Sequence, residues 1–234
     1  MNAHNAPLRL ALFDLDHTLI PFDSDATWGE FTTDLGWNDG AAFRARNAAF
    51  YEDYKAGTLD IHAYVRFATA ALRAKGPDVA AATHRLFMER VVLPRITPQA
   101  QALVASHQAQ GDTVIIITAT NAFVTRPIAE AFGVHELIAT DLARAPTADG
   151  TEWISGEIAG TPSFREGKVI RLEAWMQARG LDWGQVHTTF YSDSINDLPL
   201  LEKANVAVAA NPDPRLRAIA EARGWRILEL FAGQ

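Results

Sequence analysis

The stretch that decides the fold is LALFDLDHTLI, residues 10–20, in which an apolar run is broken by Asp14 and Asp16. As a buried strand, the run would deliver both carboxylates to the loop at its carboxyl end. Open α/β sheets bind their ligands in the crevice outside that end, and side chains spaced two apart can address one site together. Aspartate also ends strands simply because it favours turns, so this stretch alone leaves a purely structural interpretation open.

The second half of the chain predicts the rest of a parallel sheet. From Thr97 onward helical and strand-like segments alternate, as they do in α/β proteins. The run TVIII, residues 113–117, is β-branched, apolar and short, as expected of a strand covered on both faces. Further strands are predicted at residues 135–138, 186–191, 206–209 and 226–230. The weakly periodic segment 141–161 contains Asp149-Gly150, a hairpin-turn signal.

The segment between these two regions is helical. Residues 21–94 contain no convincing strand, and their apolar spacing predicts helices at about residues 24–35, 38–57, 60–76 and 78–90. Ser24 is a plausible cap for the first helix, and Gly36 ends it. The aromatic residues of this block are expected to form its own core. A helical insertion therefore directly follows the first strand.

Composition excludes several classes of function. The chain has 234 residues, of which 48% are hydrophobic, which is enough to bury a full core. Its formal charge of -7 argues against a nucleic-acid surface, and the absence of cysteine excludes disulfides, zinc thiolates and a thiol nucleophile. Neither a signal pattern nor an apolar run of roughly 18 residues is present. We expect a soluble cytoplasmic protein, monomeric or homodimeric, with no membrane or nucleic-acid partner.

Four polar clusters lie at predicted strand ends or helix starts, and together they indicate a metal and phosphate site. In chain order they are Asp14 and Asp16, then Thr118, then Lys168, and finally Asp193 with Asn196 and Asp197. Carboxylates gathered in one cleft repel one another and stay ionised only with cations among them. Oxygen ligands of this kind suit Mg²⁺.

The sequence FDLDHTL resembles the first motif, Asp-x-Asp-x-Thr, of the haloacid dehalogenase superfamily, and the other three clusters follow in that superfamily's order. The helical block after the first motif resembles the type I cap of its phosphoserine phosphatase-like branch. The resemblance implies an α/β protein with a Rossmann-like parallel sheet core, residues 1–21 and 95–234, and an inserted helical cap domain, residues 22–94. It also implies a Mg²⁺-dependent phosphatase that works through an aspartyl-phosphate.

The resemblance further implies a role for each cluster. Asp14 would be the nucleophile and Asp16 the acid and base, with Thr118 and Lys168 on the phosphate. Mg²⁺ would be held by the Asp14 and Asp193 carboxylates and the Asp16 backbone carbonyl. Asp197 would orient Lys168 or metal waters, unless it is only a salt-bridge partner, and Asn196 would donate to phosphate or substrate. Thr120 and Asn121 are either ligands or plain helix caps.

The sequence also offers candidate residues for recognition of the substrate. The fourth motif reads SDSIND, residues 192–197, where phosphoserine phosphatases usually have Gly-Asp-Gly-x-Asn-Asp. Asp23 and Asp25 follow the first motif closely and could meet a substrate amine, as in an amino-alcohol phosphate such as histidinol phosphate. A phosphoserine carboxylate would also need a cation, for which Arg44, Arg46 and Arg66 are candidates.

Two other functions compete with a phosphatase. A phosphotransferase or mutase of the same fold would use the same aspartyl-phosphate. A response-regulator receiver domain shares the acidic pair, Mg²⁺, threonine and lysine. Receivers, however, are about half this length and carry the phosphorylated aspartate on a strand of its own, in an interval that is helical here.

Overall fold

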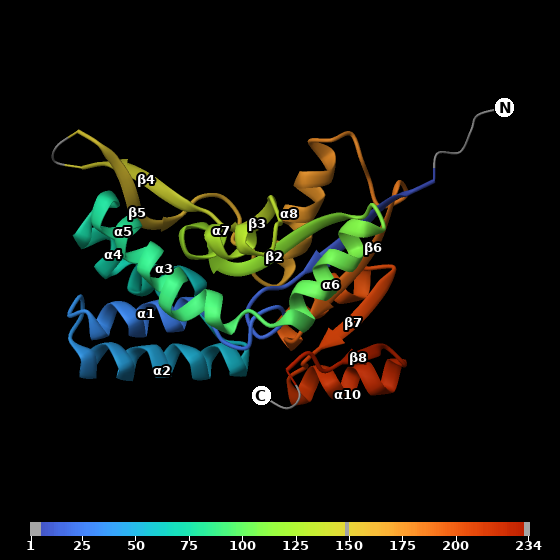
Figure 1. Ribbon diagram of the computed structural model, residues 1–234, viewed down its shortest axis with the longest axis horizontal. Helices are drawn as coiled ribbons and strands as arrows, with labels where there is room; N and C mark the ends of the chain where they lie inside the picture. Colours follow the sequence, from blue (N-terminus) through green and yellow to red (C-terminus); the bar gives the residue numbers. More distant parts are fainter. Residues whose placement is uncertain (1–5, 148–149, 232–234) are drawn as a thin grey trace.

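A computed structural model describes residues 6–147 and 150–231 of the protein. Its core is a parallel six-stranded sheet in the order β3-β2-β1-β6-β7-β8, in which β1 lies near the middle (Figure 1). The predicted α/β fold with a parallel sheet is therefore confirmed. The strands are β1 (Leu8–Phe13), β2 (Thr113–Asn121), β3 (Glu136–Thr140), β6 (Val186–Ser192), β7 (Val206–Ala210) and β8 (Arg226–Leu228).

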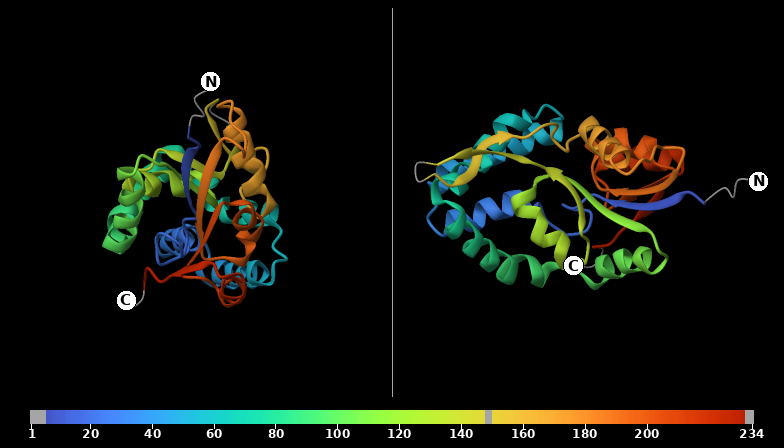
Figure 2. Two further views of the ribbon diagram at one scale, coloured as in Figure 1. Left: turned by 90° about the vertical axis from the view of Figure 1, so that its right-hand side faces the viewer. Right: turned by 90° about the horizontal axis from the view of Figure 1, so that it is seen from above.

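Helices cover both faces of this sheet (Figure 2). Leu10 and Leu12 of β1 are buried in one apolar cluster with residues of α8, α9 and α10, whereas Ala11 and Phe13 belong to a second cluster with α6 and α7. The alternation follows from the two-residue period of a strand, and burial on both faces explains why β1 is apolar throughout. These helices are α6 (Pro98–Ala109), α7 (Ala122–Ala131), α8 (Glu166–Gln177), α9 (Leu198–Lys203) and α10 (Pro214–Arg223).

The segment between β1 and β2 is helical, as predicted. Three differences are local: Asp23 rather than Ser24 caps the first helix, the third predicted helix divides at Thr69, and the fourth continues into a π-helix. At the division, the Thr69 hydroxyl donates to the Val65 carbonyl, which is a bond that weakens a helix locally. The elements are α1 (Ser24–Asp34), α2 (Gly40–Ala56), α3 (Ile61–Ala68), α4 (Ala70–Lys75), α5 (Pro77–Phe87), the π-helix Met88–Val92 and the 3₁₀ turn Leu93–Arg95.

A β-hairpin from the second half of the chain packs against this helical layer. Strands β4 (Leu142–Pro146) and β5 (Glu152–Ile158) pair antiparallel, which agrees with the predicted turn, although Asp149 lies outside the described residues. The hairpin lies along α3 and α4 (Figure 1), and the Trp153 indole donates to the Leu72 carbonyl at 3.3 Å. A division into a cap of residues 22–94 and a core remains a prediction, and β5 contacts both parts.

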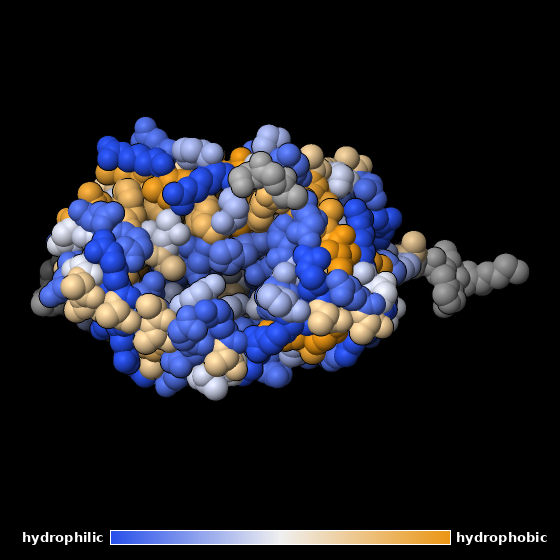
Figure 3. All heavy atoms as spheres, turned by 90° about the horizontal axis from the view of Figure 1, so that it is seen from below, coloured by the Kyte–Doolittle hydropathy of each residue, from blue (hydrophilic) through white to orange (hydrophobic). Residues whose placement is uncertain are grey.

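Aromatic rings join the helical layer to the sheet. The Trp28 ring lies 5.4 Å from that of Phe87 within the layer and 5.9 Å from that of Phe123 on α7. These aromatic residues therefore form the core of the helical block, as predicted, and also extend it to the sheet. The face formed by α2 and α10 is largely hydrophilic (Figure 3). Within the described ranges, no helix is long and apolar enough to cross a membrane.

Candidate active site

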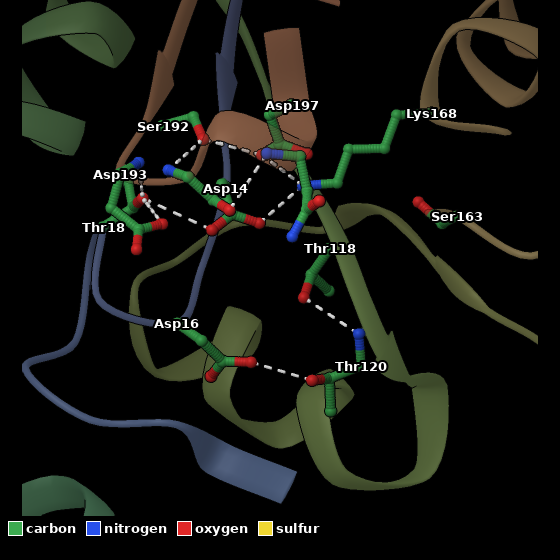
Figure 4. A network of polar contacts seen from close by, with 12 residues as sticks. Asp14, Asp16, Thr18, Thr118, Thr120, Ser163, Lys168, Ser192, Asp193 and Asp197 are labelled. Carbon is green, nitrogen blue, oxygen red and sulfur yellow. Dashed lines mark hydrogen bonds and ion pairs between the residues drawn. The ribbon is translucent and has the colours of Figure 1, made fainter. Parts of the chain in front are cut away.

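Asp14 follows β1 at the carboxyl edge of the sheet, and its carboxylate is held by a buried lysine. The Lys168 ammonium donates to Asp14 Oδ1 and to Asp197 Oδ2, both at 2.7 Å, and all three side chains are buried (Figure 4). Burial lowers the pKa of Lys168, but the two carboxylates raise it by more, so the group stays charged. Three of the predicted site residues, from distant parts of the chain, thus form one ion cluster.

The start of α8 places Lys168 at this depth. The residue lies in the first turn of the helix, where the helix dipole disfavours a cation, so the two carboxylates must compensate. Gly167 permits the close approach of the preceding loop, because a Cβ atom there would lie 2.0 Å from the Pro162 carbonyl oxygen. The helix start is therefore shaped to bury the lysine.

Two hydroxyl residues that the sequence analysis did not single out complete the cluster. The Thr18 hydroxyl lies 3.3 Å from Asp14 Oδ2 and 3.2 Å from Asp193 Oδ1, and it accepts from the Asp193 amide at 3.0 Å. Ser192 donates to Asp197 Oδ2 at 2.7 Å. The signals were present: Thr18 is the threonine of the first motif, and Ser192 replaces a motif glycine.

Asp16 is oriented away from this ion cluster, toward the helical layer. Its carboxylate accepts from the Ser24 amide and from the Thr120 hydroxyl, both at 2.8 Å. Burial, followed by the charges of Asp23 and Asp14, raises the pKa of Asp16 well above its ordinary value. The side chain therefore holds a proton more readily than a free carboxylate, as a general acid must. Thr118 is buried nearby, and its hydroxyl accepts from the Thr120 amide at 3.2 Å.

A second acidic group lies where the first helix of the layer begins. Asp23 caps α1, and Asp25 is buried in its first turn. Burial and the charge of Asp23 raise the pKa of Asp25 to about 7, against hydrogen bonds from Tyr64 and Asn121 that lower it. The Asn121 amide donates to Asp25 Oδ1 at 3.2 Å, and its oxygen caps α7. Asn121 is thus both a helix cap and a neighbour of the acidic pair, whereas Thr120 is not a cap.

The residues present fit a magnesium ion. Burial, followed by the charges of Asp14 and Asp197, raises the pKa of Asp193 well above its ordinary value, although Lys168 lowers it. The carboxylates gathered here therefore outnumber the single ammonium group. No group of three histidine, cysteine, aspartate or glutamate side chains in the described segments forms a metal cluster. In the expected donor set, one of the three protein ligands is the Asp16 backbone carbonyl. An oxygen-only set that leaves room for water suits Mg²⁺.

The last predicted residue, Asn196, faces the helical layer. Its amide donates to the Tyr54 carbonyl at 3.3 Å, and its own backbone amide donates to the Ser194 hydroxyl at 3.2 Å. The structure therefore brings Asp14, Lys168 and Asp197 into direct contact, joins Asp193 to Asp14 through the Thr18 hydroxyl, and places Asp16, Thr118 and Thr120 nearby. Asp23, Asp25 and Asn121 form a neighbouring acidic group.

Comparisons with known proteins agree with this arrangement. The family model of haloacid dehalogenase-like hydrolases matches residues 11–202. A protein of Neisseria meningitidis serogroup C named histidinol-phosphatase is 42% identical over 222 residues, covering 94% of this chain and 97% of its own.

Solved structures give the same picture of the fold. A Bordetella pertussis protein described as having unknown function is 48% identical, with a TM-score of 0.89 over 97% of this chain and all of its own. A substrate-bound phosphoserine phosphatase shares the fold at 19% identity, with a TM-score of 0.66 over 96% of this chain and 94% of its own. The chain belongs to the haloacid dehalogenase-like hydrolase family, and its relatives place it among that family's phosphatases.

Proposed function

We propose that the protein is a Mg²⁺-dependent phosphatase that hydrolyses a small phosphomonoester through an aspartyl-phosphate on Asp14. The observation that carries this proposal is the Asp14 carboxylate held at 2.7 Å by buried Lys168, with Asp16 two residues further along. The Lys168 charge offsets the repulsion between the Asp14 carboxylate and the phosphate dianion, so the carboxylate can approach phosphorus. A cluster of acidic residues on the surface would not need a buried lysine as its partner, because water would solvate its charges.

The chemistry of the chain's own residues proceeds in two steps. An Asp14 oxygen attacks phosphorus and forms the acyl-phosphate, while the bond from phosphorus to the ester oxygen breaks and Asp16 gives that oxygen its proton. Asp16 then takes a proton from a water molecule, whose oxygen attacks phosphorus and releases inorganic phosphate from Asp14. The raised pKa of Asp16 suits the first role, and the hydrogen bonds from Ser24 and Thr120 hold its carboxylate in place.

Mg²⁺ would be held by the Asp14 and Asp193 carboxylates and the Asp16 backbone carbonyl. When bound, it supplies positive charge that stabilises the phosphoryl oxygens. The Thr118 hydroxyl is the expected donor to a further phosphoryl oxygen. Asp197, through its bond to Lys168 at 2.7 Å, keeps the lysine directed at Asp14.

The leaving group is proposed to be an amino alcohol, with histidinol phosphate the first candidate. The relative named histidinol-phosphatase supports this, as does the acidic pair Asp23 and Asp25, which could meet an ammonium group. Two of the cations considered for a phosphoserine carboxylate are engaged elsewhere: Arg44 pairs with Glu30 and Asp34, and Arg66 pairs with Glu157.

The test is phosphate release from histidinol phosphate, phosphoserine, phosphoethanolamine and neutral sugar phosphates, with and without Mg²⁺. We expect metal-dependent turnover with a preference for the amino-alcohol phosphate. Asp14→Asn should lower kcat roughly thousandfold or more because it removes the nucleophile. Asp53→Asn, an exposed change on α2, serves as the control and should leave kcat unchanged. Equal turnover of neutral sugar phosphates would contradict the substrate proposal.

Transfer to an acceptor other than water is the remaining alternative, because a phosphotransferase would use the same aspartyl-phosphate. Adding an alcohol during turnover distinguishes the two activities. A hydrolase releases inorganic phosphate in proportion to the substrate consumed, whereas a phosphotransferase shows a deficit that is matched by the newly phosphorylated alcohol.

A further inference from the structure

The carboxyl-terminal end of α2 contacts the loop that carries the fourth motif. The Tyr54 hydroxyl donates to the Ser194 hydroxyl oxygen at 3.0 Å, and the Asn196 amide donates to the Tyr54 carbonyl at 3.3 Å. Tyr54 is thus bound through both its side chain and its backbone. The loop it contacts, residues 192–197, holds Asp193 and Asp197 at the phosphate site.

The same helix end also meets two other segments of the sheet domain. The Tyr54 ring lies 6.1 Å from that of Phe164, which precedes the helix of Lys168. The Arg215 guanidinium, at the start of α10, donates to the Lys55 carbonyl. Three separate segments therefore converge on one turn of α2, which makes it a docking point between the helical layer and the active-site edge of the sheet.

The partner of Tyr54 is a residue at which this chain departs from the phosphoserine phosphatase pattern. Position 194 is serine here where those enzymes usually have glycine, and a glycine could not accept the bond. The Ser194 hydroxyl oxygen accepts from both Tyr54 and the Asn196 amide, so it links the helical layer to the turn that begins at Ile195. The serine at position 194 therefore supplies the acceptor that the Tyr54 hydroxyl needs.

We infer that Tyr54 is a positioning residue for the reaction, whose bond to Ser194 fixes the loop of Asp193 and Asp197 when α2 is docked. The inference rests on the proposed function. The bond acts at the phosphate side of the site, where charge changes during the reaction, rather than on the leaving group. Its loss should therefore lower kcat more than it alters KM.

The experiment compares Tyr54→Phe with Tyr51→Phe, an exposed tyrosine one turn earlier on the same helix. Because the substitution removes one neutral hydrogen bond, we expect Tyr54→Phe to lower kcat about two- to thirteenfold, with KM changed less than about twofold. Tyr51→Phe should leave both unchanged. Hydrogen exchange of the 192–197 loop should rise in Tyr54→Phe and stay constant in Tyr51→Phe.

A double-mutant cycle identifies the partner. Ser194→Ala also loses the bond from Asn196, so it should be slower than Tyr54→Phe, but adding Tyr54→Phe to it should cause no further loss of kcat. Independent, multiplying effects would overturn the inference, as would a change in KM alone, which would indicate direct contact with the leaving group. Absence of phosphate release by the unmodified enzyme would instead contradict the proposed function.

Discussion

Lys168 and its partners show how single residues prepare the site before any substrate arrives. Ser192 donates to Asp197, Asp197 accepts from Lys168, and Lys168 donates to Asp14, each at 2.7 Å. A charge held by a chain of such bonds does not have to reorient during the reaction, which is the basis of electrostatic preorganisation. The orientation of the Asp14 carboxylate is therefore set by Thr18, four positions away, together with Lys168, 154 positions away.

Asp25 is expected to make the stability of the protein depend on pH. Burial, then the charge of Asp23, raises its pKa from 3.8 to about 7 in the folded state. Above pH 4 the unfolded chain loses this proton while the folded protein keeps it, so rising pH favours unfolding until about pH 7. Relative to Asp25→Asn, the unmodified protein should lose up to about 4 kcal/mol of unfolding free energy between pH 4 and pH 8.

Urea unfolding at a series of pH values measures this difference. Asp53→Asn, at an exposed position, should give a difference from the unmodified protein that does not vary with pH. If the difference in unfolding free energy between Asp25→Asn and the unmodified protein also did not vary with pH, the Asp25 carboxyl would be ionised in the folded protein and the prediction would be wrong. An ammonium group bound nearby would favour the ionised form, so affinity for an amine substrate should improve as pH rises through about 7.

At the scale of elements, the β4–β5 hairpin holds the helical layer from outside. The Arg73 guanidinium reaches from α4 to the Ser155 carbonyl at 3.1 Å, and Arg66 of α3 pairs with Glu157. The exposed ion pair contributes little, since such pairs are worth about 0–1 kcal/mol. The buried Trp153 ring and the Arg73 contacts carry more of the attachment.

Gly156 is the position at which this attachment can be tested. Its φ is +93°, and an added Cβ would lie 2.7 Å from Arg73 Cζ, so Gly156→Ala strains the backbone and displaces the guanidinium. We expect a loss of about 2–3 kcal/mol in unfolding free energy. Gly160→Ala, with φ of +70° and open space around it, should cost only about 1 kcal/mol. Equal losses in urea unfolding would show that the Arg73 contact does not matter.

At the scale of the whole molecule, we expect the helical layer to close over the active site about hinges near Phe22 and Pro94. The second connection consists of a π-helix followed by a 3₁₀ turn, and such irregular helix is often found at hinges. Aromatic packing of α1 and α5 on α7 restrains one side of the layer. Movement is therefore expected mainly at the side where α2 meets the 192–197 loop.

Hydrogen exchange with orthovanadate as a phosphate analogue tests the hinges. Binding should slow exchange in peptides that cover residues 20–24 and 90–97, because closure orders both connections. A peptide from the carboxyl-terminal half of α8, which packs on the face of the sheet opposite to both connections, serves as the internal control. Unchanged exchange in both connections would contradict closure about these hinges.

Much of the fold and of the site could be predicted from local pattern. The predicted strands match the observed strands with shifts of up to four residues at their ends. Neither the short helix α9 nor the division between α3 and α4 at Thr69 was predicted, because short elements give too few periodic positions. Asp14, Lys168, Asp193 and Asp197 were all identified, since polar residues at strand ends and helix starts stand out from an apolar background.

By itself, the sequence determined the order of helices and strands and the chemical character of the site, because the period of the apolar residues and the carboxylates at strand ends are local properties of the chain. Only the tertiary structure decided which side chains from distant parts of the chain contact one another. The hairpin packs on α3 and α4, Lys168 donates to Asp14 from 154 positions away, and Tyr54 donates to Ser194 from 140 positions away. Contacts such as these depend on how separate elements pack together, and no periodicity within one segment encodes its distant partner.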